Sequence, residues 1–513
     1  MLDGPASPSD RRTGFPDDPC LVELDQPVHR RNPVIKTPVT MRRTGAGEVT
    51  DDIIRYLEGQ HQTILERLKA VLRLPSVSTD PAYAEGMAAT RAHFLQRLQE
   101  MGLDDVQLLD GGGHPALYGA WRGASGAPTF IIYGHYDVQP PDPLELWHTP
   151  PFDPTIRDGR LYARGASDVK GSTTIAVEAV AAFLAVTKRC PVNVKFFLEG
   201  EEEIGSPSLR RIVERYRDLL AADAMISADG GRGSTSVPTV RVGNRGIASL
   251  EVKVRTAAKD VHSGGYGGAI RNALHELAAL MASLHDAEGR IVVPAFMAEV
   301  PKLTAQQRQD TAALPFDQAA FFASIGGSPC GDATYTLRER LTLQPTIEIN
   351  GMWGGYTGPG IKTVIPCEAQ AKITMRLVPG QDPDKAALAV RRHLEAQCQP
   401  GVTLTFSEIS GGSPAFSLTP DHPLLAAAIA VLERTTGRRP IATRAGGTLP
   451  ITSIFKEMLG LDTLAFGFAM PDEDAHAPNE FFRISSLHDG LAAWPLLLAE
   501  LARYNPGDFR KNA

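Results

Sequence analysis

The chain has 513 residues, of which 43% are hydrophobic and 22% charged, as is typical of a globular protein. This length exceeds one ordinary hydrophobic core, so at least two domains are expected. The net charge of −7 provides no basic surface for nucleic acid or for an anionic membrane, and neither partner is expected.

Membrane insertion and secretion are not expected either. No apolar run reaches the length of a bilayer span, and the first residues lack the apolar core of a secretory signal. The five cysteines are scattered without a Cys-x-x-Cys spacing, which is typical of a reducing compartment. We therefore predict a cytoplasmic location and no thiolate metal site.

Residues 1–48 are polar and rich in proline, and we predict a tail there. From Asp51 to about residue 242, helical periodicity alternates with short apolar runs. The pattern predicts helical structure from Asp51 until Pro75 ends the run, helices near 86–101, 172–186 and 208–220, and strands at 116–121, 129–133, 193–198 and 224–227. Helices that alternate with buried strands indicate a mixed, largely parallel α/β sheet with helices on both faces.

The pattern changes near Gly243, where residues 247–255 alternate between apolar and polar, as in a sheet with one open face. The order strand, helix, strand, strand, helix, strand predicts a ferredoxin-like α+β domain over 247–255, 269–284, 345–350, 369–377, 383–397 and 403–407. A helix at 422–435, a strand at 463–468 and a helix at 485–504 complete the chain. We therefore predict a main domain at 49–242 and 411–513, interrupted by an inserted domain at 243–410.

A histidine and an aspartate directly follow the predicted strand at 129–133: His135 and, two residues on, Asp137. An imidazole that binds a metal through one nitrogen usually donates its other N–H to an acceptor, which fixes the tautomer. The spacing therefore indicates a metal ligand and the carboxylate that orients it.

Further carboxylates and a second histidine follow later predicted strands, namely Glu202, Glu203, Asp229 and His476. Any one of the thirteen histidines alone is most simply interpreted as a loop residue. In open α/β sheets, however, ligands bind outside the carboxyl ends of the strands, so residues distant in sequence converge there. The set is large enough to hold two divalent metals.

The glutamate run leaves its register open, because Glu199 and Glu201 offer the same chemistry as their neighbours. For Glu201 we expect a solvated loop position. The Glu-Glu-x-Gly-Ser ending of the run favours Glu202 and Glu203 as the functional pair.

These segments, together with Asp168 in the run Ser167-Asp168-Val169-Lys170-Gly171, resemble the M20 metallopeptidase family over about residues 51–505. The resemblance implies two divalent metal ions, Zn²⁺ or alternatively Mn²⁺. It also implies their ligands: His135 and Asp229 on one ion, Glu203 and His476 on the other, and Asp168 with a water bridging both. The peptide bond after the bridging aspartate is typically cis in the family.

The resemblance also implies the roles of two further carboxylates. Asp137 would orient His135, and Glu202 would be the general base. Two metals about 3.5–4 Å apart lower the pKa of a shared water and polarise the scissile carbonyl. A carboxylate beside them takes the proton of the water and later protonates the leaving amine.

One histidine of the predicted insertion, His262, resembles a family residue that reaches the active site of a partner subunit and stabilises the oxyanion. This implies a homodimer formed through the inserted domain. Without a dimer, a capping or loop histidine is the simpler interpretation.

Other segments resemble elements that bind the substrate. Arg376 would hold a carboxylate with its planar guanidinium, and a surface ion pair is an equally good alternative. The loop that cradles the C-terminal carboxylate would comprise Arg444, Gly446, Gly447 and Thr448, in which a threonine replaces the usual serine. Asn350 is a weaker candidate for a polar contact.

The resemblance therefore implies a metal-dependent exopeptidase of short peptides, nearest the dipeptidase branch. Val169 stands where dipeptidase-like members often carry an aspartate, whereas Asp229 favours that branch over the deacylases. One alternative is a hydrolase of N-acyl or N-carbamoyl amino acids. A remote alternative is a noncatalytic binding protein on the same fold, against which the complete set of ligands and base argues.

Overall fold

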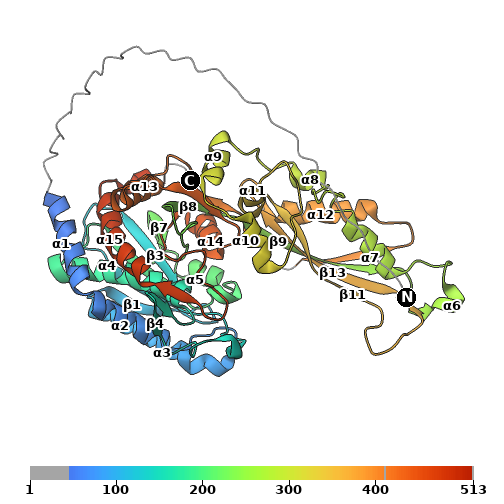
Figure 1. Cartoon of the computed structure of the whole chain (residues 1–513), viewed down its shortest axis with the longest axis horizontal. Helices are drawn as coiled ribbons and strands as arrows, with labels where there is room; N and C mark the ends of the chain where they lie inside the picture. Colours follow the sequence, from blue (N-terminus) through green and yellow to red (C-terminus); the bar gives the residue numbers. More distant parts are fainter. Residues whose placement is uncertain (1–44, 409–411, 511–513) are drawn as a thin grey trace, which may run out of the picture. The chain divides into compact units, whose positions relative to one another are not determined.

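The computed structural model describes residues 45–408 and 412–510. The predicted tail at 1–48 lies outside them, except for its last residues, which begin helix α1 (Gly45–Gly59). The described residues contain a nine-stranded and a four-stranded sheet, each with its own hydrophobic core (Figure 1). The chain passes from one to the other between β8 (Thr239–Asn244) and β9 (Gly246–Arg255). The domain limits at 49–242, 243–410 and 411–513 remain predictions.

The nine-stranded sheet has the order β1-β2-β6-β3-β7-β17-β8-β15, and β16 pairs with β8. Its central strands β6, β3, β7 and β17 run parallel, whereas β2 runs antiparallel to both of its neighbours, β1 and β6, so the predicted mixed α/β sheet is confirmed. The strands other than β8 are β1 (Asp104–Leu109), β2 (Ala116–Trp121), β3 (Thr129–His135), β6 (Asn193–Glu199), β7 (Ala224–Ser227), β15 (Phe416–Ser417), β16 (Ile441–Ala445) and β17 (Thr463–Ala465).

Helices cover both faces of this sheet because successive side chains of a strand point to opposite sides. In β3, Phe130 and Ile132 join one core, and Ile131 and Tyr133 join the other. The first core is shared with α1, α2 (His61–Leu72), α3 (Ala84–Glu100), α4 (Gly171–Thr187), α13 (Pro423–Thr436) and α15 (Ile484–Leu501). The second is shared with α5 (Leu209–Arg215) and α14 (Pro450–Leu459).

One run in the described residues is long and apolar enough, by length and composition, to cross a membrane: Ala166–Thr187, which comprises η3 (Ala166–Lys170) and α4. The expectation that no such run exists was therefore wrong. The most apolar part of this helix is 89% buried inside the protein. A helix that is apolar all round is buried by other elements, and here β3 and α15 pack against it.

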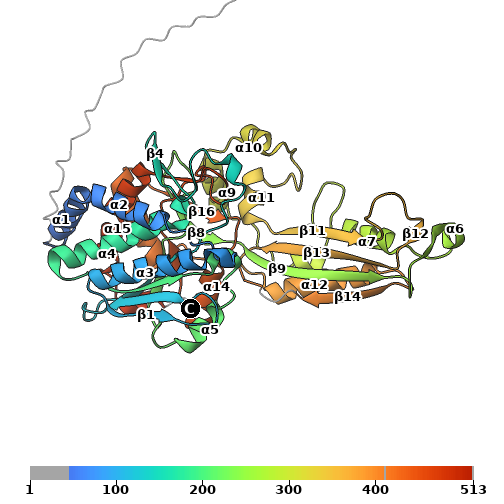
Figure 2. The ribbon, with the colours of Figure 1, turned by 90° about the horizontal axis from the view of Figure 1, so that it is seen from below.

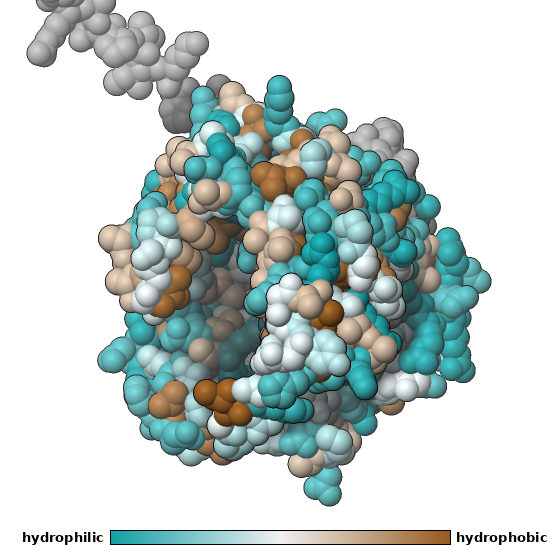
Figure 3. Space-filling model, turned by 90° about the vertical axis from the view of Figure 1, so that its right-hand side faces the viewer, coloured by the Kyte–Doolittle hydropathy of each residue, from teal (hydrophilic) through white to brown (hydrophobic). Residues whose placement is uncertain are grey.

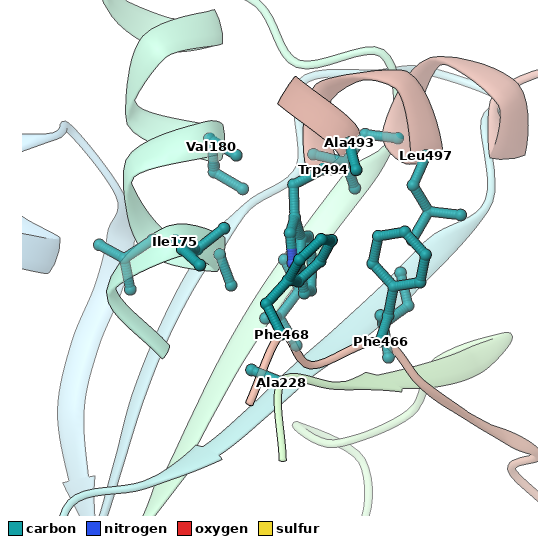
Figure 4. Packing of buried hydrophobic residues seen from close by; sticks show 14 of the residues in the cluster. Ile175, Val180, Ala228, Phe466, Phe468, Ala493, Trp494 and Leu497 are labelled. Atoms are coloured by element: carbon teal, nitrogen blue, oxygen red, sulfur yellow. The ribbon is translucent and has the colours of Figure 1, made fainter. Parts of the chain in front are cut away.

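Trp494 of α15 is the largest fully buried side chain in this region. Figure 4 shows it between Ile175 and Val180 of α4 on one side and Phe466 on the other. The ring of Phe466 meets it edge-on at a centroid distance of 5.7 Å. Its Nε1 atom is buried and has no hydrogen-bond partner among the described residues, so the indole contributes through packing alone.

We expect Trp494→Ala to destabilise the protein by about 3–5 kcal/mol, because it leaves a large cavity between α4 and α15. Trp494→Phe should cost clearly less, since it keeps most of the ring volume and loses no hydrogen bond. Urea-induced unfolding followed by circular dichroism measures both. Equal losses in the two variants would contradict the packing argument.

The four-stranded sheet has the order β11-β13-β9-β14 and is antiparallel throughout (Figure 2). The chain order of its elements is the predicted ferredoxin-like one: β9, α7 (Ala273–Ala282), β11 (Thr346–Gly354), β13 (Glu368–Leu377), α12 (Pro383–Gln397) and β14 (Thr403–Glu408). Alternate residues of β9, such as Leu250 and Val252, are buried against α7 and α12. Four short helices that the sequence analysis missed lie between α7 and β11: α8 (Pro294–Met297), α9 (Ala305–Ala313), α10 (Gln318–Ile325) and α11 (Leu337–Leu343).

Candidate metal centre

The predicted metal ligands come from five separate segments. His135 is the last residue of β3, Glu203 lies in η4 (Glu202–Ile204) after β6, and Asp229 follows β7. Asp168 lies in η3, directly before α4, and the Asp168–Val169 peptide is cis. His476 lies between β17 and β18 (Phe481–Arg483). The parallel strands end at one edge of the sheet, which brings these segments together.

The carboxylate of Asp168 lies between the two histidines. Its Oδ1 atom is 3.1 Å from His135 Nε2, and its Oδ2 atom is 2.9 Å from His476 Nε2. A second carboxylate accompanies each imidazole: Asp229 Oδ2 lies 3.8 Å from His135 Nε2, and Glu203 Oε2 lies 3.2 Å from His476 Nε2. Each oxygen of Asp168 thus faces one histidine–carboxylate pair.

This arrangement fits divalent cations. Candidate ligand atoms of His135, Asp168 and Glu203 all lie within 4.8 Å of one another. Burial, together with the neighbouring Asp168 carboxylate, raises the pKa of Asp229 to about 6. Hydrogen bonds with Asp168 and Glu203 raise the pKa of His476 to about 10. Such crowding of acidic groups favours positive charge between them, and imidazole with carboxylate is a donor set that several divalent metals accept.

Asp137 contacts His135 chiefly through its main chain. The carbonyl oxygen of Asp137 lies 3.0 Å from His135 Nδ1, whereas its Oδ1 atom is 3.5 Å away. The other oxygen, Oδ2, accepts the backbone N–H of Glu203 at 3.1 Å. Burial lowers the pKa of His135, but hydrogen bonds with Asp137 and Asp168 outweigh it and raise that pKa well above its usual value. Asp137 therefore links the segments that carry His135 and Glu203.

The contacts of the glutamates at 199–203 distinguish those at the metal centre from those with a structural role. Glu202 lines a cavity beside Asp168 and Asp229, and burial raises its pKa well above the usual value. Glu199 is buried and accepts the hydroxyl of Tyr133 at 3.0 Å.

The expectation that Glu201 is solvated was wrong. Its side chain is buried and accepts the backbone N–H groups of His114 at 2.8 Å and Ser208 at 2.9 Å. Loop N–H groups that leave the solvent need such an acceptor.

The predicted substrate-binding residues divide into two groups. Arg376 Nη1 donates to Thr448 Oγ1 at 2.8 Å, and Thr448 Oγ1 donates to the carbonyl of Arg245 at 2.8 Å. Gly447 and Thr448 line the same cavity as the metal-site carboxylates, while the carbonyl of Gly446 accepts from Arg245 Nε at 2.8 Å. One element of the four-stranded sheet and one loop of the main sheet thus meet beside the cavity.

The other predicted residues do not line this cavity. Arg444 lines a different cavity and donates to Ser417 Oγ at 3.2 Å. Asn350 is exposed on β11. His262 is exposed, and its Nδ1 atom accepts the backbone N–H of Gly264, which caps α6 (Ser263–Tyr266).

Sequence reasoning missed two buried carboxylates behind the cluster. Glu480 accepts the backbone N–H groups of Gly165, Ser167 and Asp168 at 2.8–3.0 Å and pairs with Arg164 at 2.6 Å.

The second of these carboxylates, Glu473, accepts the hydroxyl of Ser167 at 2.7 Å. The two glutamates flank His476 in sequence and anchor its segment to the turn that carries Asp168. Their only signal in the sequence is proximity to His476.

We expect Glu480→Gln to weaken metal binding about 10- to 100-fold, because outer hydrogen bonds orient the ligands of a metal site. Titration calorimetry of the metal-free protein with Zn²⁺ measures the change. The matched control is Glu457→Gln, which removes an exposed surface partner of Arg210 and should leave Zn²⁺ affinity unchanged. Equal affinity in Glu480→Gln and wild type would show that Glu480 does not position Asp168.

Comparison with known proteins assigns this site to a family. Residues 131–500 match the profile of peptidase family M20/M25/M40. The β-Ala-His dipeptidase of Homo sapiens is 30% identical over 475 residues, which cover 88% of this chain and 93% of that protein. The Cys-Gly metallodipeptidase dug1 of Schizosaccharomyces pombe is 27% identical over 473 residues, covering 89% and 99%.

Solved structures of dipeptidases are similar to this chain as well. The dipeptidase Dug1p from Saccharomyces cerevisiae has a TM-score of 0.74 at 25% identity, and human carnosine dipeptidase 1 has 0.72 at 28%. In both comparisons 89% of this chain and 99% of the other are covered. The chain therefore belongs to peptidase family M20/M25/M40. It is a metallopeptidase, an enzyme that hydrolyses peptide bonds and uses divalent metal ions, which confirms the resemblance found in the sequence.

Proposed function

We propose that this enzyme cleaves dipeptides and other short peptides at a centre of two metal ions. The observation that carries the proposal is the position of Asp168, whose two oxygens face two separate histidine–carboxylate pairs. The dipeptidase names of the relatives that match over nearly the whole chain support the same substrate class.

The proposal assigns His135 and Asp229 to one ion, His476 and Glu203 to the other, and Asp168 to both. We infer Zn²⁺, with Mn²⁺ as the alternative, since imidazole and carboxylate ligands suit both. When bound, the two ions supply an activated water and polarise the scissile carbonyl.

Glu202 is the proposed general base. Its carboxylate lines the cavity next to Asp168 and Asp229, and burial raises its pKa, which favours proton uptake. Glu202 takes a proton from the attacking water and returns it to the leaving amine. Asp137 acts as a positioning residue, because it contacts both His135 and the backbone of Glu203.

A short substrate is supported by the cavity itself. It measures about 170 Å³, below the roughly 300–1,000 Å³ of ordinary ligand pockets. Thr448 lines it together with the metal-site carboxylates and is bonded to Arg376. We propose that this pair, with Gly446 and Gly447, holds the C-terminal carboxylate. Arg444 and Asn350 do not line this cavity, so we assign them no contact with a substrate bound within one subunit.

Glu202→Gln should retain both metals and lose at least about 100-fold in kcat, because the general base is removed while the ligands remain. The assay is hydrolysis of dipeptides, tripeptides, N-acetyl and N-carbamoyl amino acids by metal-loaded enzyme, with metal content measured in parallel. Glu214→Gln, an exposed residue of α5, is the matched control and should behave as wild type. Cleavage of N-acyl or N-carbamoyl substrates alone would reject the dipeptidase proposal in favour of a deacylase.

We also propose a homodimer formed through the inserted domain. β11 is an edge strand of the four-stranded sheet, and its Ile349, Met352 and Trp353 are 40–49% exposed. Figure 3 views the molecule from the right-hand side of Figure 1, and hydrophobic residues are scattered there among hydrophilic ones. An exposed apolar edge strand favours pairing with another chain. His262 would then serve the partner's site through Nε2, since Nδ1 already accepts from Gly264.

His262→Ala and Glu202→Gln should each be nearly inactive, yet their mixture should regain activity. A mixed dimer has one site with both Glu202 and the opposite subunit's His262, so random exchange restores about one quarter of wild-type activity. The measurement is dipeptide hydrolysis after subunit exchange, with each variant alone as control. Absence of any recovery in verified mixed dimers would refute a shared site.

A cytoplasmic location is the last part of the proposal. Among the described residues, Cys190, Cys330, Cys367 and Cys398 are all free, and free thiols are typical of a reducing compartment.

A further inference from the structure

The cavity beside the metal cluster contains an arginine that the proposed mechanism does not use. Arg241 lies on β8 and lines the cavity together with Asp229 and Glu202. It is the only residue of β8 that is not buried in the sheet. Hydrogen-bonded strands on both sides, β16 and β17, hold its backbone in place.

The guanidinium of Arg241 is unpaired within the part of the chain that the structure describes. Among residues 45–408 and 412–510, none forms a hydrogen bond or an ion pair with it. Three other arginines near the site do have such partners: Arg164 pairs with Glu480, Arg245 donates to Gly446 and Gln344, and Arg376 donates to Thr448. A guanidinium carries five donors in a fixed fork, and a desolvated charge without partners is costly. The position of Arg241 therefore calls for an anion from outside the chain.

The carboxylates of the site do not supply this anion. Burial lowers the pKa of Arg241, and Asp229 and Asp168 act on it electrostatically without forming an ion pair. Both of these carboxylates are assigned to the metals in the proposed function. Two bound dications would add positive charge next to Arg241, which strengthens the need for a further anion.

The lining of the cavity indicates which part of the substrate approaches Arg241. Asp229 and Glu202 line it, and so do Gly447 and Thr448. A C-terminal residue that connects the scissile bond to the carboxylate anchor at Thr448 lies within this cavity. Its side chain shares the cavity with Arg241.

We propose that Arg241 binds the side-chain carboxylate of the C-terminal substrate residue, so that the enzyme prefers peptides ending in glutamate or aspartate. This inference rests on the proposed function. The site then holds two carboxylates at two cationic positions, the terminal one at Arg376 and Thr448 and the side-chain one at Arg241. The planar fork of arginine suits a carboxylate in two parallel hydrogen bonds, whereas an amide of the same shape offers one acceptor only.

The test compares kcat/KM for Ala-Glu, Ala-Gln, Ala-Leu and Glu-Ala with metal-loaded enzyme. Wild type should prefer Ala-Glu over Ala-Gln about 10- to 100-fold, mainly through KM. Arg241→Met should bring this ratio close to one. Arg241→Lys keeps the charge without the fork and should give an intermediate ratio, which serves as the measurement if the methionine variant does not fold.

The matched control is Arg232→Met. Arg232 lies nearby but stacks on Phe468 at 4.3 Å and does not line the cavity of the metal cluster, so the ratio should stay at the wild-type value. A wild-type ratio near one, an unchanged ratio in both Arg241 variants, or a preference for Glu-Ala over Ala-Glu would overturn the inference and leave the proposed function standing. Failure to cleave any peptide would overturn the proposed function, and this inference with it.

Discussion

The site is organised around one carboxylate placed between two imidazoles. Asp168 faces His135 and His476 at once from η3, whose backbone departs from helical geometry at Asp168 and Val169 before α4 begins. Glu480 accepts three backbone N–H groups in and beside η3, and the backbone N–H of Lys170 donates to the carbonyl of Gly165 at 3.0 Å. A reactive cluster of like charges is thus supported by a second layer of charged groups that are themselves hydrogen-bonded.

The main sheet determines where these groups meet, and the inserted sheet contributes Arg376 beside the cavity. Parallel strands deliver His135, Glu203 and Asp229 to one edge, as their order in the chain predicts. Arg376 comes from the inserted sheet and supports another part of the cavity wall through Thr448. The carboxylate anchor proposed above therefore combines a strand of the inserted sheet with a loop of the main sheet.

Local sequence patterns predicted most of the regular elements, but they predicted few of the features that depend on burial. The central strands and long helices were found because their apolar runs are strong, whereas β1 was missed because most of its residues are exposed. His135, Glu203 and Asp229 were proposed as ligands because they lie at or after the ends of predicted strands, whereas the role of Asp168 came from the family resemblance. Glu201 was misjudged and Glu480 overlooked, because nothing near them in sequence shows that they are buried acceptors of backbone N–H groups. The position of Arg241 in the cavity wall was not predicted, because the sequence does not show that β8 contributes a side chain to the cavity.

The hydrogen bond between Arg376 and Thr448 joins the two sheets at the position proposed for the substrate carboxylate. An incoming carboxylate competes with the threonine hydroxyl for the same donor. If this bond must break before the ligand binds, its free energy reduces the binding free energy of the ligand. By thermodynamic linkage, the bound ligand then weakens the contact between the sheets by the same free energy. Binding of a carboxylate in the cavity and the contact between the two sheets would therefore be coupled through Arg376.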